Sequence, residues 1–267
     1  MYVSRTARYV MAAFVAVVLV VLYFPILYIA RLSFNTAREF AWPPRGWTLE
    51  WWRATYHAPG PRDALFRSLK VAVVASTVAL VLGTLASFAL TRYRFFGRNA
   101  VSFIAVLPIA LPGIVTGIAL NSGYSRAGIK LSFFTLVVAH ATFCIVIVYN
   151  NVAARLRRLS PNLEEASADL GADMFQTFGF ITFPLMRSAL LAGALLAFAL
   201  SFDEIVVTTF TAPGGFQTLP LWIFDNMFRP NNLPLVNVVA TVVVVLSIIP
   251  VYLAQRLSDG AVGVSGR

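Results

Sequence analysis

Two adjacent carboxylates, Asp203 and Glu204, lie within an apolar stretch of the sequence. A charged side chain at the centre of a membrane helix costs about 2.5–3.5 kcal/mol on insertion scales, so such groups usually face a bundle interior or a cavity. Arg187 marks the expected cytoplasmic end of this stretch. Asp203 lies about 24 Å further along a helix that rises 1.5 Å per residue, which is beyond the middle of a bilayer. The pair therefore predicts a cation pathway in the outer half of a membrane. The alternatives are a buried pair satisfied by a neighbour such as His140 or Asn121, or a pair at a frayed helix end.

Two prolines spaced four residues apart, Pro108 and Pro112, lie in another apolar stretch. Each removes a backbone donor, so we expect a kink there. Gly113 and Gly117 follow with the spacing that permits close packing of two helices. A second interpretation is a discontinuous helix that lines a substrate path, and it can hold together with close packing. The residues predicted along such a path are Pro112, Gly113, Thr116, Asn121, Asp203 and Glu204.

The composition indicates that membrane-spanning helices position these residues. Of the 267 residues, 59% are hydrophobic and 12% are charged, whereas soluble domains carry about 25% charge. Six long apolar intervals are each close to the roughly 20 residues that a helix needs to cross a bilayer, and only helices satisfy their own backbone at that length in lipid. We therefore predict an all-α membrane protein, a single transmembrane domain over residues 1–267 with six transmembrane helices at about 9–30, 71–91, 99–121, 131–154, 188–211 and 235–255.

Several kinds of chemistry are excluded by the sequence. The single cysteine, Cys144, and the isolated His140 provide neither a disulfide nor a metal site. No glycine-rich phosphate loop and no HExxH motif occurs, so we expect no catalytic residue and no cofactor bound by this chain. The net charge of +10 comes from arginines that flank apolar spans, which is ordinary membrane topology rather than a nucleic-acid surface.

With a cytoplasmic N-terminus, 11 basic residues lie inside and 10 outside, so the total charge leaves the topology open and two segments favour this orientation. The short link at 92–98 carries three arginines and no acid, and three more arginines lie at 155–158. The positive-inside rule places such segments in the cytoplasm. With six spans, we expect the C-terminus to be cytoplasmic as well.

The polar segment 155–187, between the fourth and fifth predicted spans, carries its own helix signals. Ser160-Pro161 offers an N-cap followed by proline at the first helical position. Asn162 with Glu165 is an alternative cap with capping-box spacing. Glu164 and Glu165 then occupy the first turn, where carboxylates interact favourably with the helix dipole.

The same segment contains the signals for a second short helix. Gly171 can adopt the left-handed conformation that ends a helix. Asp173 with Gln176 repeats the start signal, and Pro184 precedes the next span. We therefore predict two short helices that are joined at Gly171 and held at the membrane surface.

The pattern Glu165-Ala166-Ser167-x3-Gly171-x9-Ile181-x-Phe183-Pro184 resembles the EAA loop of binding-protein-dependent ABC permeases, whose family pattern is EAA-x3-G-x9-I-x-L-P. Ser167 replaces the second alanine, small for small, and Phe183 replaces the leucine, apolar for apolar. The spacing is intact over all 20 residues and the segment precedes an apolar span.

The resemblance implies a coupling mechanism. In this family the loop docks into a cleft on a separate ATPase subunit, which holds ATP and magnesium, and closure of two ATPases moves the membrane spans. By resemblance Glu165 contacts the ATPase, Ala166 and Ser167 allow close approach, and Gly171 sets the angle between the two helices. The residues expected at the contact are Glu164, Glu165, Ala166, Ser167, Asp169, Gly171, Ile181 and Pro184.

The resemblance also implies partners and a location. The chain would be a non-catalytic, multi-pass permease subunit in a bacterial inner membrane, with two ATPase subunits, a homologous second permease and an extracytoplasmic substrate-binding protein. Three further segments resemble the second permease of the spermidine/putrescine branch, which implies polyamine transport: Leu111–Gly117, Ser201–Ile205 and Leu219–Phe224.

Other functions are compatible with parts of the pattern. Permeases for iron, sulfate, other organic cations and other small solutes are related to the polyamine branch. An ion-coupled secondary transporter could use Asp203 and Glu204 as its cation site, but that reading leaves the EAA-like loop unexplained. An intramembrane enzyme has no supporting motif in the sequence.

Overall fold

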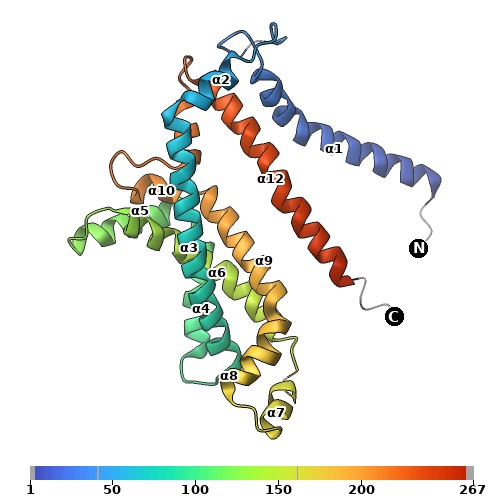
Figure 1. Ribbon diagram of the computed structural model, residues 1–267, viewed down its shortest axis with the longest axis vertical. Helices are drawn as coiled ribbons and strands as arrows, with labels where there is room; N and C mark the ends of the chain where they lie inside the picture. Colours follow the sequence, from blue (N-terminus) through green and yellow to red (C-terminus); the bar gives the residue numbers. More distant parts are fainter. Residues whose placement is uncertain (1–3, 41, 161, 263–267) are drawn as a thin grey trace. The chain divides into compact units, whose positions relative to one another are not determined.

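The computed structural model describes residues 4–40, 42–160 and 162–262, and within these ranges it contains helices and no strand. The expectation of an all-helical chain is therefore met. The chain divides into two compact units. One comprises the residues up to Arg62 together with those from Trp222 onward, and the other comprises Asp63–Leu221 (Figure 1).

The first unit is organised around its C-terminal helix. Its helices are α1 (Arg5–Leu32), α2 (Glu50–His57), most of α11 (Leu219–Asn226) and α12 (Leu233–Val262). α12 packs against both α1 and α2. Between α1 and α2 the chain folds around the buried Asn35, whose side chain accepts from the Arg45 N–H at 2.7 Å and whose carbonyl accepts from the Trp51 indole at 2.8 Å.

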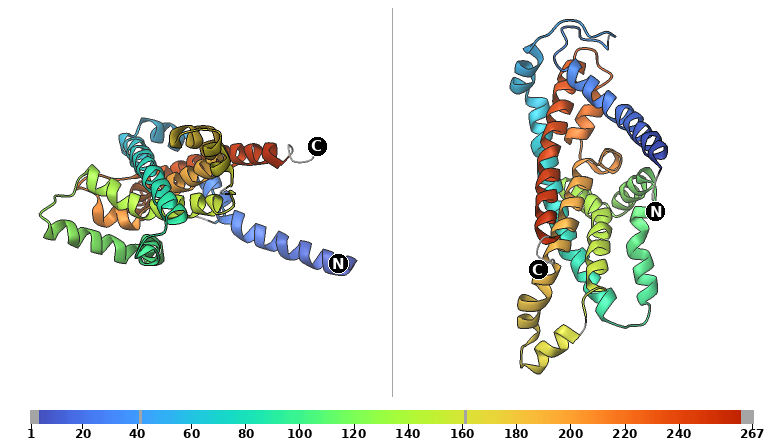
Figure 2. Two further views of the ribbon diagram at one scale, coloured as in Figure 1. Left: turned by 90° about the horizontal axis from the view of Figure 1, so that it is seen from below. Right: turned by 90° about the vertical axis from the view of Figure 1, so that its right-hand side faces the viewer.

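The second unit contains both candidate sites. Its helices are α3 (Pro59–Arg92, whose first residues belong to the first unit), α4 (Arg98–Ala110), α5 (Gly113–Arg126), α6 (Phe133–Leu156), α7 (Asn162–Asp169), α8 (Met174–Thr177), the π-helix η1 (Phe178–Thr182), α9 (Phe183–Phe202) and α10 (Val206–Thr211). α6 and α9 lie side by side (Figures 1 and 2). The α7–α8 segment adjoins the start of α9, and α10 follows its end and packs against α5 and α6.

α6 is the most deeply buried of the long apolar helices in the described residues. Its Phe143, Cys144 and Val148 form a core with Met186 and Ala197 of α9. α3 approaches α6 at Gly83, where a Cβ would lie 2.8 Å from the Ile145 carbonyl oxygen, so only glycine permits this approach. One turn further along α3, the Ser87 hydroxyl shares its hydrogen between the Gly83 carbonyl at 2.7 Å and the Tyr149 carbonyl of α6 at 3.0 Å.

Four helical runs in the described part of the chain are long and apolar enough to cross a membrane: α1, α3, α6 and Met174–Phe202. The first two contain the predicted spans 9–30 and 71–91, and α6 covers the predicted span 131–154 except for its first two residues. α12 contains the predicted span 235–255, but its apolar part within the described side chains, Leu233–Ile248, is too short to be counted with the four.

The predicted span 99–121 is two helices rather than one. α4 ends before Leu111, whose backbone is extended (φ −86°, ψ 141°), and α5 begins after Pro112. Proline lacks an N–H and disfavours helical geometry in the residue before it, so a break at this dipeptide is expected. Pro108 lies within α4. Each half is about 20 Å long at 1.5 Å per residue, which is less than the roughly 30 Å of a bilayer core.

The predicted span 188–211 is also interrupted. α9 ends at Phe202, Asp203 is its C-cap residue (φ −89°, ψ 1°), and α10 begins at Val206. The assumption of one continuous helix through Asp203 and Glu204 is therefore corrected, because the two carboxylates lie in the break. A break leaves free N–H groups at the start of the following helix, and a carboxylate in the break can accept a hydrogen bond from one of them. A continuous helix has no free N–H at that point.

Candidate functional site

The loop between α6 and α9 forms the hinged pair of short helices that its sequence predicts. Gly171 lies between α7 and α8 with a φ of +82°, in the left-handed region. Its N–H donates to the Ala168 carbonyl at 2.9 Å, and the Ala172 N–H donates to the Ser167 carbonyl at 3.1 Å. These are the paired hydrogen bonds of a Schellman C-cap. A Cβ at Gly171 would meet no atom within 4 Å, so the backbone angle alone accounts for the glycine.

The start of α8 is the capping box expected from the sequence. The Asp173 side chain accepts from the Gln176 N–H at 2.8 Å, and the Asp173 N–H donates to the Gln176 side chain at 2.9 Å. α7 begins at Asn162. The Ser160-Pro161 cap predicted for α7 involves Pro161, which lies outside the described residues.

The two glutamates in the first turn of α7 have different surroundings. Glu164 is half-buried, pairs with Arg92 at the end of α3 at 2.9 Å, and accepts from the Thr182 hydroxyl in η1 at 3.2 Å. Glu165 is exposed, and its side chain has no hydrogen bond or ion pair with any residue that the structure describes. Glu164 therefore holds α7 against two elements of its own chain, whereas Glu165 is available to another subunit.

Ser167, the departure from the EAA pattern, has a structural partner. Its side chain is buried on α7, and its hydroxyl lies 3.0 Å from the hydroxyl of Thr177 on α8. An alanine at this position could not make the bond. Ser167 therefore ties the two short helices together across the Gly171 hinge, a role that the sequence pattern did not indicate.

The loop exposes several large apolar side chains as well as Glu165. Leu170, Met174, Phe175 and Phe180 are each at least 76% exposed, and clustered exposed apolar side chains mark interaction surfaces. The remaining predicted contact residues differ in burial: Ala166, Asp169 and Pro184 are exposed and Ile181 is half-buried. The loop thus presents exposed carboxylates, Glu165 among them, together with large exposed apolar side chains.

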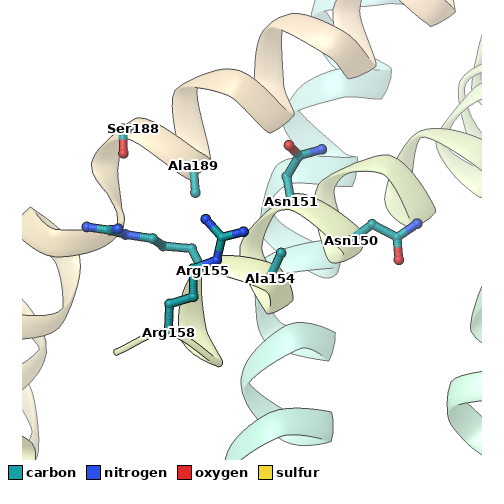
Figure 3. Close-up of a pocket in the computed structure, with 7 residues that line it drawn as sticks. All are labelled: Asn150, Asn151, Ala154, Arg155, Arg158, Ser188 and Ala189. Atoms are coloured by element: carbon teal, nitrogen blue, oxygen red, sulfur yellow. The ribbon is translucent and has the colours of Figure 1, made fainter. Parts of the chain in front are cut away.

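A basic hollow of about 480 Å³ lies beside this loop, between the end of α6 and the start of α9 (Figure 3). Its lining residues are Asn150, Asn151, Ala154, Arg155, Arg158, Ser188 and Ala189. The Arg155 side chain crosses to α9 and its Nε donates to the Leu185 carbonyl at 2.8 Å. This bond fixes the start of α9, and with it the α7–α8 segment, to the end of α6.

At the other end of α9, the two carboxylates face different surroundings. Asp203 is exposed and has no hydrogen bond from its side chain to any described residue. Glu204 is half-buried, and its Oε1 accepts from the Val207 N–H in the first turn of α10 at 2.8 Å. Glu204 thus caps α10, which leaves Asp203 as the carboxylate with unused hydrogen-bonding capacity.

Both carboxylates border a hollow of about 430 Å³ between α6 and α9. Apart from these two residues, its lining is apolar: Ile147, Leu196, Ala199 and Leu200. A negative charge at the edge of an apolar hollow favours an organic cation that carries both charge and methylene surface. The hollow is therefore chemically suited to such a ligand.

The breaks in the two interrupted spans are brought together by the packing of α5 on α10. A Cβ at Gly117 would lie 2.7 Å from the Phe210 ring, and one at Gly113 would lie 3.5 Å from Val206. The Asn121 side chain donates to the Phe210 carbonyl. The predicted path residues Pro112, Gly113, Thr116 and Asn121 thus shape one end of this unit, and the Thr116 hydroxyl is buried without a partner among the described residues.

The neighbours suggested for the carboxylates have other partners. Asn121 is engaged by Phe210, and His140 is buried with its ring nitrogens 2.9 Å from the hydroxyls of Ser201 and Thr208. Sequence reasoning missed Ser201, Thr208 and the Arg92 partner of Glu164, because each contact joins residues at least 61 positions apart. A lone histidine in an apolar span was the only local signal for the first two.

Comparison with known proteins places the chain among transport proteins. Residues 79–264 match the family described as "binding-protein-dependent transport system inner membrane component". The chain is 34% identical over 247 residues to the spermidine/putrescine transport system permease protein PotC of Haemophilus influenzae, covering 92% of this chain and 95% of that protein. It is 34% identical over 230 residues to the putrescine transport system permease protein PotI of Escherichia coli, covering 83% and 81%.

The fold also matches a solved structure. A bacterial ABC transporter involved in the import of the acidic polysaccharide alginate aligns with a TM-score of 0.69, covering 97% of this chain and 99% of that chain. The two sequences are 18% identical, so this likeness concerns the fold alone.

Proposed function

The chain belongs to the family of inner-membrane components of binding-protein-dependent transport systems, and we propose that it forms half of the membrane path of an ATP-driven polyamine importer. It is a permease subunit of an ABC importer and not an enzyme, since members of this family transport while a separate subunit hydrolyses ATP. The observation that carries the ATP-driven part of the proposal is that the α7–α8 hinge exposes Glu165 and several large apolar side chains.

Family membership implies three kinds of partner: an ATPase, a substrate-binding protein and a second permease. We infer two ATPase copies, which bind ATP and magnesium, and a homologous second permease that completes the path. The chain is a multi-pass membrane protein. We infer a bacterial inner-membrane location with six crossings and cytoplasmic termini, in which α4 with α5 and α9 with α10 each make one interrupted crossing.

The coupling roles within the loop follow from what each residue contacts. Glu165 and the exposed apolar side chains of the loop are proposed to enter the ATPase cleft, because the Glu165 carboxylate has no partner among the described residues and the apolar side chains are not covered by them. Glu164, Ser167 and Gly171 are proposed to keep the docked helices in one shape, through the Arg92 ion pair, the Thr177 bond and the left-handed turn. Movement of the ATPase would then pass to α3 and α9.

Two observations support a polyamine as the substrate. The relatives PotC and PotI carry names that assign them to spermidine and putrescine transport. Asp203 presents an exposed carboxylate beside an apolar hollow of about 430 Å³, which suits a chain of methylenes that carries ammonium groups. Because Glu204 caps α10, Asp203 is proposed as the residue that meets the cation.

The test is ATP-dependent uptake of radiolabelled spermidine and putrescine into proteoliposomes that contain the complete importer. Asp203→Asn should lower the uptake rate about tenfold, as expected when a charged group loses a hydrogen-bonded ion contact. Glu204→Gln should have a smaller effect, because the amide oxygen can still accept from Val207. Thr209→Val, which alters an exposed hydroxyl on α10 that bonds only the Ile205 carbonyl, is the matched control.

The outcomes separate the parts of the proposal. Normal uptake by both carboxylate variants, with normal assembly, would exclude a pathway role for the pair. Absence of polyamine binding by the cognate binding protein would exclude the substrate class while leaving the permease function intact. Uptake of another solute in the same vesicles would then identify the class of substrate that replaces it.

A further inference from the structure

His140 is a completely buried polar residue in the middle of α6, and each of its ring nitrogens faces a hydroxyl. Nδ1 lies 2.9 Å from the Ser201 hydroxyl, and Nε2 lies 2.9 Å from the Thr208 hydroxyl. All three side chains are at most 3% exposed. Buried hydrogen bonds of this kind hold their partners in one arrangement, because losing either partner leaves a polar group unsatisfied in apolar surroundings.

The proton positions in this cluster follow from the hydrogen-bond pattern. The Thr208 hydroxyl has one hydrogen, which it donates to the Glu204 carbonyl at 2.7 Å. It must therefore accept from His140, so Nε2 carries the proton. In the neutral ring Nδ1 is then an acceptor, and it receives the hydrogen of Ser201. A neutral imidazole thus satisfies both hydroxyls without any charge.

The two hydroxyls lie on opposite sides of the break in the fifth predicted span. Ser201 is in the last turn of α9, and Thr208 is in α10. The break between them contains Asp203 and Glu204. His140 is therefore a side chain from a third helix that bridges the two halves, and the Thr208 bond to Glu204 extends the connection into the break itself.

We propose that His140 is a positioning residue that fixes the angle between α9 and α10 and thereby aims Asp203 at the hollow between α6 and α9. The transport consequence rests on the proposed role of Asp203 in cation passage. The geometric consequence does not, because the bridge is formed whether or not the carboxylate meets a substrate.

The chain provides a closely matched control for this role. Cys144 is one turn further along α6, is fully buried, and donates to the Ala197 carbonyl of α9 at 3.3 Å. Like the His140–Ser201 bond, it joins α6 to α9, but Cys144 makes no bond to α10 in the described residues. Removal of the cysteine by Cys144→Ala therefore reports the effect of losing an α6–α9 bond alone.

The first experiment measures ATP-dependent spermidine uptake and the ATPase activity stimulated by the loaded binding protein. His140→Leu should lower uptake about tenfold while the stimulated ATPase activity and the assembly of the complex are retained. His140→Gln, which keeps a donor and an acceptor, should recover at least half of the uptake, and Cys144→Ala should match the unaltered protein. Normal uptake by His140→Leu would overturn the positioning role in transport.

A triple variant distinguishes positioning from the cost of unsatisfied hydroxyls. His140→Leu with Ser201→Ala and Thr208→Val removes all three polar side chains together, so no side chain of the cluster is left unsatisfied. The one group that loses a partner is the Glu204 carbonyl, which accepts from the Thr208 hydroxyl. If the bridge positions the break, uptake stays low in the triple variant. If unsatisfied groups alone cause the defect, the triple variant recovers, which would contradict the proposal. Should His140→Leu fail to reach the membrane, two single variants make the same comparison. Ser201→Ala removes one bond to the ring, and Thr208→Val removes one bond to the ring and one to the Glu204 carbonyl.

The second experiment measures geometry without transport. In the Cys144→Ala background the chain has no other cysteine, so Asp203→Cys introduces a single thiol in the break. Its rate of reaction with a water-soluble thiosulfonate should change severalfold in His140→Leu and stay the same in His140→Gln. An unchanged rate in His140→Leu refutes the bridge. A changed rate combined with normal uptake by Asp203→Asn retains the bridge and refutes the pathway role of Asp203.

Discussion

The ion pair between Arg92 and Glu164 joins α7 to the end of α3. The two side chains are 20% and 32% exposed and lie 2.9 Å apart, so solvent screening limits the pair to about 1–2 kcal/mol. Arg92→Glu and Glu164→Arg should each reduce the uptake achieved per ATP hydrolysed, because α7 is then repelled from α3. The double charge exchange should restore most of it, since the opposite charges again face each other.

This exchange is measured with the complete importer in proteoliposomes, comparing uptake and ATP hydrolysis in the same sample. Glu164→Gln is the control for loss of the charge without its reversal. Its amide oxygen can still accept from the Thr182 hydroxyl. A double variant no better than either single variant would show that the ion pair does not connect α3 to the loop.

At the scale of elements, the packing of α5 on α10 sets how the two interrupted spans meet. A Cβ at Gly117 would lie 2.7 Å from the Phe210 ring and 3.2 Å from the Phe210 Cβ, whereas a Cβ at Gly123 on the same helix would meet nothing within 4 Å. Gly117→Ala should therefore destabilise the protein by about 1–3 kcal/mol through overpacking. Gly123→Ala should be neutral or slightly stabilising, because alanine is the better helix former. The midpoint of thermal unfolding in detergent measures both, and equal midpoints would contradict the close contact.

The elements also show where sequence reasoning succeeds. The Gly171 turn and the Asp173–Gln176 capping box were predictable, because each is decided by residues within six positions of one another. The break at Leu111–Pro112 had a local cause in proline, although its extent, a full interruption instead of a kink, was not determined by the proline alone.

Other features depend on contacts that no local pattern encodes. The break at Asp203–Glu204 contains no proline or glycine, and its stabilising bonds come from Val207 within the turn and from His140 on another helix. The partners of Glu164 and Ser167 were likewise decided by the folding of α3, α7 and α8 around the hinge. The EAA-like pattern identified the loop, but only the structure separates the glutamate that faces inward from the one that faces outward.

At the scale of the whole molecule, Glu165 has a function only if another subunit supplies its partner. It is exposed in the first turn of α7, and its side chain has no partner in the described chain. Glu165→Lys should therefore leave folding and membrane insertion unchanged and weaken ATPase association about 10- to 100-fold, since a hydrogen bond to a charged group contributes about 1.5–3 kcal/mol. Uptake should be abolished.

The control for this charge reversal is Glu50→Lys, which makes the same change at an exposed glutamate in the first turn of α2. Co-purification of the ATPase with the tagged permease measures association, and membrane abundance measures folding. If Glu165→Lys lowers membrane abundance, the glutamate stabilises the subunit itself and the apolar surface of the loop must be explained in another way. If abundance is normal and only the ATPase is lost, Glu165 serves to bind the ATPase. Docking of the loop then explains how movement of the ATPase during ATP hydrolysis is passed to α9.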